Sequence, residues 1–333
     1  MRPPIKVGLA LPQYDYSVAG ESPLRYETIV EYARTAERAG FDSLWLSDHL
    51  FLDLAKYGGP PEPAALFDPV VTFAALACEV TQPRFGTLVL LEALRPASVL
   101  AKSLAGLDVV CGGRLDVGVG AGWYEPEYDA IGMTMPTPGE RLARLREAIV
   151  VLRGLLGGGP CTFDGTYHRA DGAVNQPAAV QTPHPPIIVG GKGDRLLRLV
   201  AELADGWNTC WAWTPDDYAA RAAVLDRACA EVDRDPASVH RSLGLYALAG
   251  EDAADLTRRF DRLVALTPPG VLRDVTLEQW RHGRLVGTVA ELREQRERWA
   301  ALGVGELIVG SGAVPFQVTT LDDVELLGEA LCA

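Results

Sequence analysis

Short apolar runs alternate along the chain with longer segments whose apolar residues recur every three or four positions. The short runs have the length and β-branched content of buried strands, and the longer segments have the spacing of amphipathic helices. This spacing predicts helices over residues 24–39, ending before Gly40, and over residues 139–156. Asp68 and Pro69 are expected to open another helix, with Asp68 as its N-cap. The predicted strands are residues 5–9, 43–46, 85–90, 115–119, 187–189, 206–210, 241–248 and 306–309.

The alternation of strands and helices predicts an α/β fold. Strands that are apolar throughout and are joined by helices are typical of parallel sheets buried on both faces. Eight such units predict a (β/α)8 TIM barrel, with a doubly wound open sheet as the alternative. Residues 157–186 are rich in Gly and Pro and are expected to form an insertion. Because no linker interrupts the pattern, residues 1–333 are interpreted as a single domain.

Composition disfavours several classes of protein. The chain has 333 residues, a net charge of −13 and no basic tract, which argues against nucleic acid as a partner. No apolar run reaches the roughly 20 residues of a membrane span, and no signal peptide is recognisable, so a cytoplasmic protein is expected. The six cysteines form no C-x-x-C pair and the five histidines no H-x-x-x-H pair, so no metal site is predicted.

An acidic and a basic side chain follow the second predicted strand. In a TIM barrel the chemistry takes place at the carboxyl ends of the strands, and Asp48 and His49 lie at such an end. A carboxylate beside an imidazole can act there as an acid–base pair or can orient a ligand. The alternative is that Asp48 caps a turn and His49 packs within the loop.

Glycines alternate in the segment GVGAG, which ends the fourth predicted strand. The spacing differs from the G-x-G-x-x-G of dinucleotide-binding folds, and Glu140, near the expected acidic position, falls in a predicted helix. One interpretation is a barrel strand with small residues where side chains crowd. We favour another, in which Gly120, Ala121 and Gly122 leave room for a flat ligand to approach the backbone, with Trp123 at the rim.

A second glycine-rich segment, Gly190-Gly191-Lys192-Gly193, follows the fifth predicted strand and precedes a helix. Backbone N–H groups at the amino end of a helix bind phosphate, and the helix dipole adds to the attraction. The spacing is not that of a Walker A loop. The alternative is a plain turn with Asp194 as the helix cap, but Lys192 favours the phosphate site.

Several segments together resemble a known family. They are GFDSLWLSDHLF, GTLVL, AKSLAGLDVVCGGRLDVGVGAGWYEPEYDAIG, GERLARLREAIVVLRGL, HPPIIVGGKGDRLLRLVAELADGWN and VGTVAELREQRERWAALGVGELIV. In this order they resemble the luciferase-like monooxygenase superfamily, and within it the F420-dependent (LLM class) oxidoreductases. The resemblance runs from about residue 5 to residue 309.

The resemblance implies that an isoalloxazine-like ring lies at the barrel mouth beside Asp48 and His49. Leu88 and Val89 are implied to form a bulge behind the ring, where members of the family often have a non-proline cis peptide. Trp123 and Trp207 are implied to wall the substrate pocket, although the sugar-phosphate dehydrogenases of the family have Glu at the position of Trp123. The implied cofactor-binding residues are Asp48, Leu88, Val89, Ala121, Gly122, Gly190, Gly191, Lys192 and Gly193.

The function implied by the resemblance is hydride transfer between F420 and a small organic substrate. His49 would donate or accept a proton, and Asp48 would position it. The first alternative is an FMN-dependent monooxygenase that takes reduced flavin from a partner reductase. The second is a barrel that binds flavin or another ligand without turnover. The expected partners are the small-molecule substrate, a second copy of the chain in a homodimer, and a flavin or F420 reductase in trans.

Overall fold

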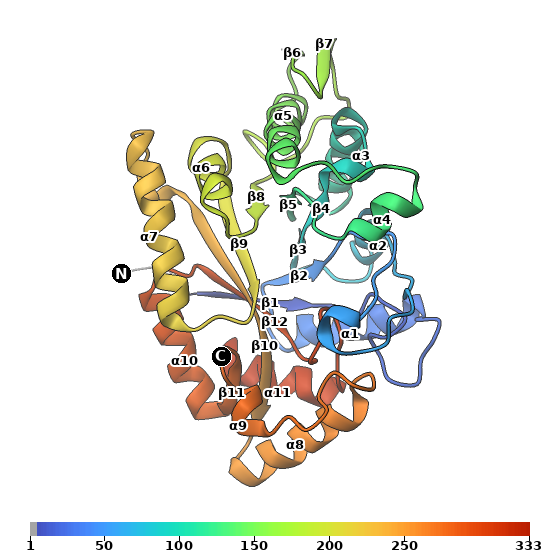
Figure 1. Cartoon of the computed structure of the whole chain (residues 1–333), viewed down its shortest axis with the longest axis vertical. Coiled ribbons are helices and arrows are strands. Elements are labelled where there is room, and N and C mark those ends of the chain that lie inside the picture. Colours follow the sequence, from blue (N-terminus) through green and yellow to red (C-terminus); the bar gives the residue numbers. More distant parts are fainter. Residues whose placement is uncertain (1–4) are drawn as a thin grey trace.

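Eight parallel strands close into a barrel at the centre of the molecule (Figure 1). The computed structural model describes residues 5–333. Each strand pairs with two neighbours, and β1 closes the ring by pairing with both β2 and β12. The TIM-barrel prediction is therefore confirmed. The barrel strands are β1 (Lys6–Ala10), β2 (Ser43–Leu46), β3 (Arg84–Thr87), β5 (Leu115–Gly120), β8 (Ile187–Gly190), β9 (Gly206–Trp211), β10 (His240–Gly250) and β12 (Glu306–Gly310).

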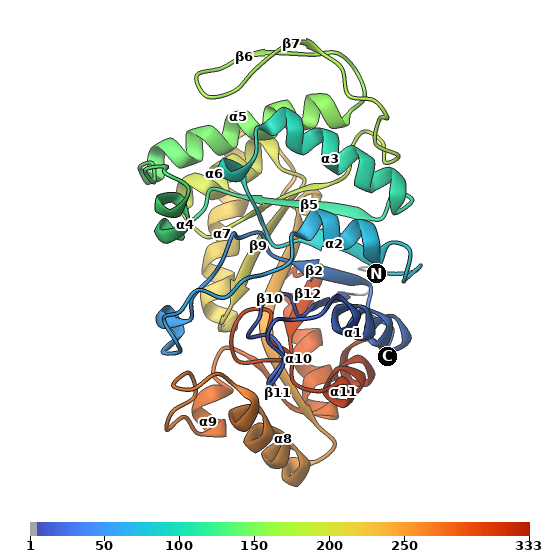
Figure 2. The same ribbon diagram turned by 90° about the vertical axis from the view of Figure 1, so that its right-hand side faces the viewer.

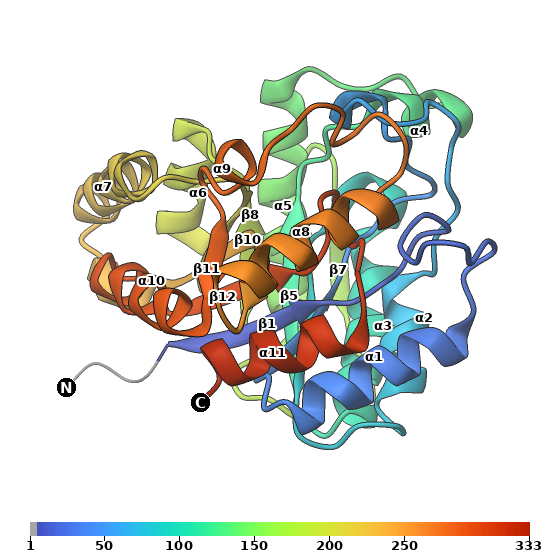
Figure 3. The ribbon, with the colours of Figure 1, turned by 90° about the horizontal axis from the view of Figure 1, so that it is seen from below.

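Helices cover the outside of the barrel and bury their apolar faces against the strands. The last helix lies beside the first, which completes the outer layer (Figure 3). Asp68 caps α2 as predicted, because its side chain accepts a hydrogen bond from the backbone N–H of Val71 at 2.9 Å. The helices are α1 (Tyr26–Arg38), α2 (Pro69–Leu76), α3 (Ala97–Val110), α4 (Glu125–Ala130), α5 (Pro138–Leu156), α6 (Asp194–Leu203), α7 (Pro215–Glu231), α8 (Ala253–Leu266), α9 (Leu277–Trp280), α10 (Val289–Ala301) and α11 (Leu321–Leu331). None of these described helices has the length and apolar character to cross a bilayer.

The third predicted strand is divided in two. The prediction of one strand over residues 85–90 is wrong, because β3 ends at Thr87 and a separate short strand, β4 (Leu90–Leu91), pairs with β5. The run is apolar throughout, so hydrophobicity alone gives no sign of the break. The two residues between these strands, Leu88 and Val89, reach the carboxyl end of the barrel.

The predicted insertion contains regular structure. An antiparallel hairpin of β6 (Cys161–Asp164) and β7 (Arg169–Ala173) lies beyond α5, on the side away from the barrel strands (Figure 2). Another strand was not predicted from the sequence. It is β11 (Leu285–Thr288), which pairs with the carboxyl end of β10. Both additions lie outside the eight-stranded barrel itself.

A fully buried tryptophan lies inside the barrel. Trp45 is fully buried, and its indole N–H donates to Ser43 Oγ at 2.7 Å. Cβ atoms at Gly8 and Gly86 would lie within 2.5 Å and 2.4 Å of the indole. Glycine at these two strand positions therefore makes room for one large ring in a close-packed interior.

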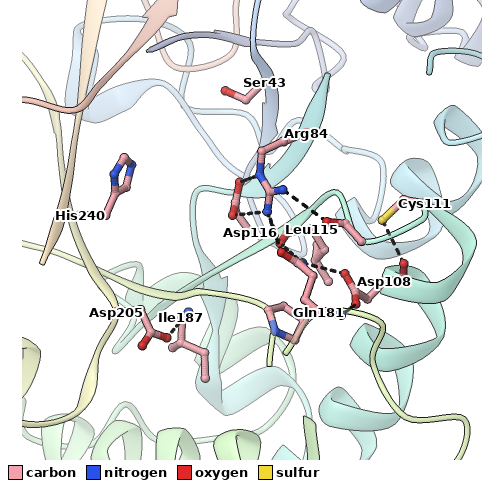
Figure 4. A network of polar contacts seen from close by, with 12 residues as sticks. Ser43, Arg84, Asp108, Cys111, Leu115, Asp116, Gln181, Ile187, Asp205 and His240 are labelled. Atoms are coloured by element: carbon pink, nitrogen blue, oxygen red, sulfur yellow. Dashed lines mark hydrogen bonds and ion pairs between the residues drawn. The ribbon is translucent and has the colours of Figure 1, made fainter. Parts of the chain in front are cut away.

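A network of polar side chains connects the amino ends of β3 and β5 (Figure 4). Arg84 donates through Nε and Nη2 to both carboxylate oxygens of Asp116, each at 2.7 Å. The Gln181 amide N–H groups bridge from there to Asp108 at 2.8 Å and to the Leu115 carbonyl at 2.7 Å. This network ties the return of the insertion to α3 and β5. It leaves the opposite, carboxyl end of the barrel free to form a site.

Candidate active site

The carboxyl ends of the barrel strands surround a cavity of about 400 Å³. Loops after β1, β2, β5, β8 and β12 form its wall, together with β9 and the segment between β3 and β4. Gly193 and Trp207 are not part of this wall. The residues predicted from the sequence that do line it are Asp48, His49, Leu88, Val89, Gly120, Ala121, Gly122, Trp123, Gly190, Gly191 and Lys192.

His49 is held by a carboxylate from a distant part of the chain. Its Nδ1 lies 2.7 Å from Oε1 of Glu127, on α4, and Glu127 Oε2 accepts the Leu50 backbone N–H at 2.9 Å. Glu127 is only 1% exposed, which shields this contact from water. The rings of Trp123 and Tyr124 meet the imidazole nearly at right angles. With Nδ1 engaged by Glu127, Nε2 is the nitrogen left for a ligand in the cavity.

Asp48 has a different partner from the one the sequence suggested. The prediction that Asp48 positions His49 is wrong, because the Asp48 carboxylate accepts two hydrogen bonds from Arg95, at 2.7 Å and 3.1 Å. It also accepts the Leu91 backbone N–H at 2.9 Å. Burial raises the pKa of Asp48, and the hydrogen bonds and charge of Arg95 oppose that rise. Asp48 therefore anchors the chain that follows Leu88 and Val89.

The peptide bond between Leu88 and Val89 is cis, as the resemblance implied. The Val89 side chain packs against the ends of β5 and β8. A Cβ atom at Gly120 would lie 2.6 Å from Val89 Cγ2, and one at Gly190 would lie 2.9 Å from Val89 Cγ1. These two glycines therefore accommodate Val89.

Neighbouring side chains fill the Cβ positions of the glycines at the end of β5 and just after it. Gly122 has a positive φ of 76°, and a Cβ there would lie 2.5 Å from Leu91 Cδ1 and 2.7 Å from Tyr128 Oη. The Cβ positions of Gly120 and Gly122 are therefore taken by neighbouring side chains, so each glycine makes room for part of the protein. Their backbone still lines the cavity, and Trp123 lies at the rim with 45% of its surface exposed. That a flat ligand approaches the backbone of this segment stays a prediction.

The second glycine segment leads directly into α6. Gly193 is the N-cap, and it has no side chain to bond the N–H groups of the first turn. Asp194 is the first helical residue and pairs with Arg221 at 2.7 Å, so the alternative in which Asp194 caps the helix is wrong. These N–H groups, together with Lys192, form a suitable site for a phosphate.

Trp207 supports this loop rather than the cavity. The prediction that Trp207 walls a substrate pocket is wrong, because its ring is fully buried and stacks on Tyr218 at 5.5 Å. Its indole N–H donates to the Gly191 carbonyl at 2.7 Å. The aromatic residue of β9 that does line the cavity is Trp211.

Other residues of the wall were not identified from the sequence. Tyr14 and Phe316 lie in the loops after the first and last barrel strands, and Tyr57 ends a short 3-10 helix after β2. Their position after predicted strands could have pointed to the cavity. Aromatic residues are common in such loops, however, so that position alone did not single these three out. Across residues 5–333, no group of three or more His, Cys, Asp or Glu side chains is arranged to hold a metal ion.

The sequence is similar to several characterised proteins. It is 30% identical over 323 residues to the F420-dependent hydroxymycolic acid dehydrogenase of Mycobacterium tuberculosis, covering 92% of this chain and 82% of that one. It is 29% identical over 255 residues to the 5,10-methylenetetrahydromethanopterin reductase of Methanolobus tindarius, covering 77% and 71%.

Proteins with low sequence identity to this chain have the same fold. The structure of a riboflavin lyase with modified FMN and riboflavin superposes with a TM-score of 0.78 at 15% identity, covering 98% of this chain and 90% of that one. Residues 8–307 match the family model of the luciferase-like monooxygenases. We conclude that the chain belongs to the luciferase-like monooxygenase family and is an oxidoreductase.

Proposed function

We propose that this protein transfers a hydride between the deazaflavin F420 and a small organic substrate in the barrel-mouth cavity. The observation that carries the proposal is one cavity that joins His49, the Leu88–Val89 turn and the Gly190–Lys192 loop. The relative from Mycobacterium tuberculosis, which is F420-dependent, supports the choice of cofactor. The fold alone makes no such choice, because the riboflavin lyase structure contains a modified FMN.

The residues present fit a flat ring that carries a phosphate on its tail. Leu88, Val89 and Ala121 offer an apolar surface to a ring. The first turn of α6, with no side-chain cap, and the Lys192 ammonium offer donors and positive charge to a phosphate. When bound, F420 supplies the hydride chemistry, and the protein supplies orientation and the exclusion of water.

His49 is proposed to exchange the proton that accompanies hydride transfer. With Nδ1–H donated to Glu127, the neutral ring presents the Nε2 lone pair to the cavity and can accept a proton. The protonated ring presents an Nε2–H and can donate one to a substrate oxygen or nitrogen. Glu127 is proposed as a positioning residue that fixes the tautomer and the ring orientation.

F420 is expected to bind with a dissociation constant in the micromolar range or below. The measurement is a fluorescence titration of the purified protein with F420 and, separately, with FMN. Micromolar binding of FMN without binding of F420 would overturn the cofactor assignment in favour of the flavin-dependent alternative. A screen of oxidised and reduced F420 against carbonyl, imine, alkene and alcohol compounds then identifies a substrate.

Glu127→Gln is expected to lower kcat about 10-fold to 100-fold with little change in KM. The amide keeps the size of the side chain but can hold the imidazole in either tautomer, so part of the protein has the wrong nitrogen facing the cavity. The measurement is steady-state kinetics with the substrate found in the screen. Glu125→Gln, an exposed carboxylate on the same helix, is the matched control and is expected to keep wild-type kcat. Equal kcat in both variants would exclude the positioning role.

A further inference from the structure

Aromatic rings gather on one side of the cavity. Tyr14 and Phe316 come from the loops after β1 and β12, with ring centroids 6.1 Å apart. Trp211, at the end of β9, meets Phe316 edge to face at 5.6 Å and stacks at 5.3 Å on Tyr246 behind it. These contacts hold the rings in place, so this side of the wall is pre-formed for a planar apolar group.

The glycine loop lies across the barrel from Tyr14, whereas Trp211 ends β9, the strand next to β8. In the closed order of strands, β1 and β8 are separated by three strands on either side. Tyr14 therefore extends from the strand opposite the one that leads into Gly190 and Lys192. A cofactor whose phosphate lies at the glycine loop leaves the side of Tyr14 and Phe316, after β1 and β12, for the substrate.

The charges that line the cavity do not balance. Its two carboxylates are both satisfied, Asp48 by Arg95 and Glu127 by His49. Lys56 also lines the cavity, and among residues 5–333 it has no carboxylate partner within ion-pair distance. The mouth of the cavity is therefore positive although the whole chain carries a charge of −13.

Lys56 is held at the rim by aromatic contacts. Its Nζ lies 4.1 Å from the centroid of a Trp123 ring and 5.9 Å from that of Tyr57. A cation over an indole keeps its charge available to a second, anionic partner. Lys192, the other lysine of the wall, belongs to the glycine loop and is assigned to the cofactor in the proposed function.

We infer that the substrate is a planar, largely apolar molecule with one anionic group, such as a carboxylate. Its body lies against Trp211 and Phe316, and its anionic group pairs with Lys56. The inference rests on the proposed function in one respect, namely that the cofactor occupies the glycine-loop side and takes Lys192. It makes Lys56 a determinant of specificity for the substrate.

The test compares 2-naphthoate with 2-naphthamide, which has the same ring system but no charge. Both are titrated by calorimetry into the protein saturated with F420 and into the free protein. Naphthoate is expected to bind about twofold to fivefold more tightly than naphthamide, because a partly exposed ion pair contributes up to about that much. The preference is expected to shrink in 0.5 M salt, on the order of a few-fold, because salt screens exposed charges.

Lysine variants test whether Lys56 is the residue that causes the preference for naphthoate over naphthamide. Lys56→Met is expected to abolish it, whereas Lys192→Met and the exposed Lys102→Met on α3 are expected to retain it. Equal affinities in the wild type, no binding of naphthoate at millimolar concentration, or loss of the preference only in Lys192→Met would each overturn the inference.

The same experiment separates this inference from the proposed function. If F420 fails to bind but free protein shows a Lys56-dependent preference for naphthoate, the cofactor proposal is wrong and the anion site stands. If F420 binds and the two probes bind equally, the substrate class is wrong and the cofactor proposal stands.

Discussion

Replacing His49 with alanine is expected to lower kcat by at least about 100-fold, the usual contribution of a positioned general acid or base. The affinity for F420 is expected to stay within about threefold, because the apolar and phosphate contacts proposed for the cofactor come from other residues of the wall, such as Leu88, Val89 and Lys192. The physical reason is that His49 is the only histidine among the described residues that line the cavity, and its Nδ1 is engaged by the buried carboxylate of Glu127. The measurements are kcat with the screened substrate and a fluorescence titration with F420.

Two comparisons make this result specific. His282→Ala removes an exposed imidazole outside the cavity and is expected to leave kcat unchanged. Added imidazole is expected to restore part of the activity of His49→Ala, since a small base can enter the space that the side chain leaves. A His49→Ala enzyme with more than about a fifth of wild-type kcat would remove His49 from the proton-transfer step.

The barrel could be predicted because its strands and helices differ in period. Buried parallel strands are apolar throughout and short, and the covering helices have one apolar face, so each unit is visible in the sequence. The break at Leu88 and Val89 was not visible, because both residues are apolar and continue the run. The hairpin in the insertion was missed for the opposite reason, since β7, Arg169–Ala173, has few apolar residues to mark it as a strand.

The site was predicted in position but not in all its contacts. A TIM barrel places the ends of its strands together, so the loops at His49, Gly122 and Gly190 could be assigned to one cavity. The partner of His49 could not be found in this way, because Glu127 lies 78 residues further along, on the helix Glu125–Ala130 that sequence periodicity does not reveal. The partner of Asp48 was also missed, because residues that are adjacent in the chain need not bind each other. Asp48 accepts hydrogen bonds from Arg95 instead.

Gly118→Ala is expected to destabilise the protein by about 3 kcal/mol or more, or to prevent folding. A Cβ at this position of β5 would lie 1.8 Å from the backbone carbonyl oxygen of Thr87 and 3.1 Å from Val89 Cγ1. A backbone atom cannot move aside as a flexible side chain can. The Thr87 hydroxyl also exchanges two hydrogen bonds with the Gly118 backbone, both at 2.8 Å, which fixes the two strands at this distance. The measurement is the free energy of unfolding in urea.

Gly106→Ala is the matched control for this prediction. Gly106 lies inside α3, and apart from its chain neighbours and the surrounding helix backbone no described atom lies within 4 Å of the position that its Cβ would take. Alanine there is expected to stabilise the protein by about 0.5 to 1 kcal/mol, because it restricts the unfolded chain and favours the helix. Opposite signs for the two substitutions would show that the glycines of GVGAG are needed for close packing of β5 against the Thr87–Val89 segment. A Gly118→Ala protein within about 1 kcal/mol of the wild type would show that the Thr87–Val89 segment can shift to make room for the added methyl group.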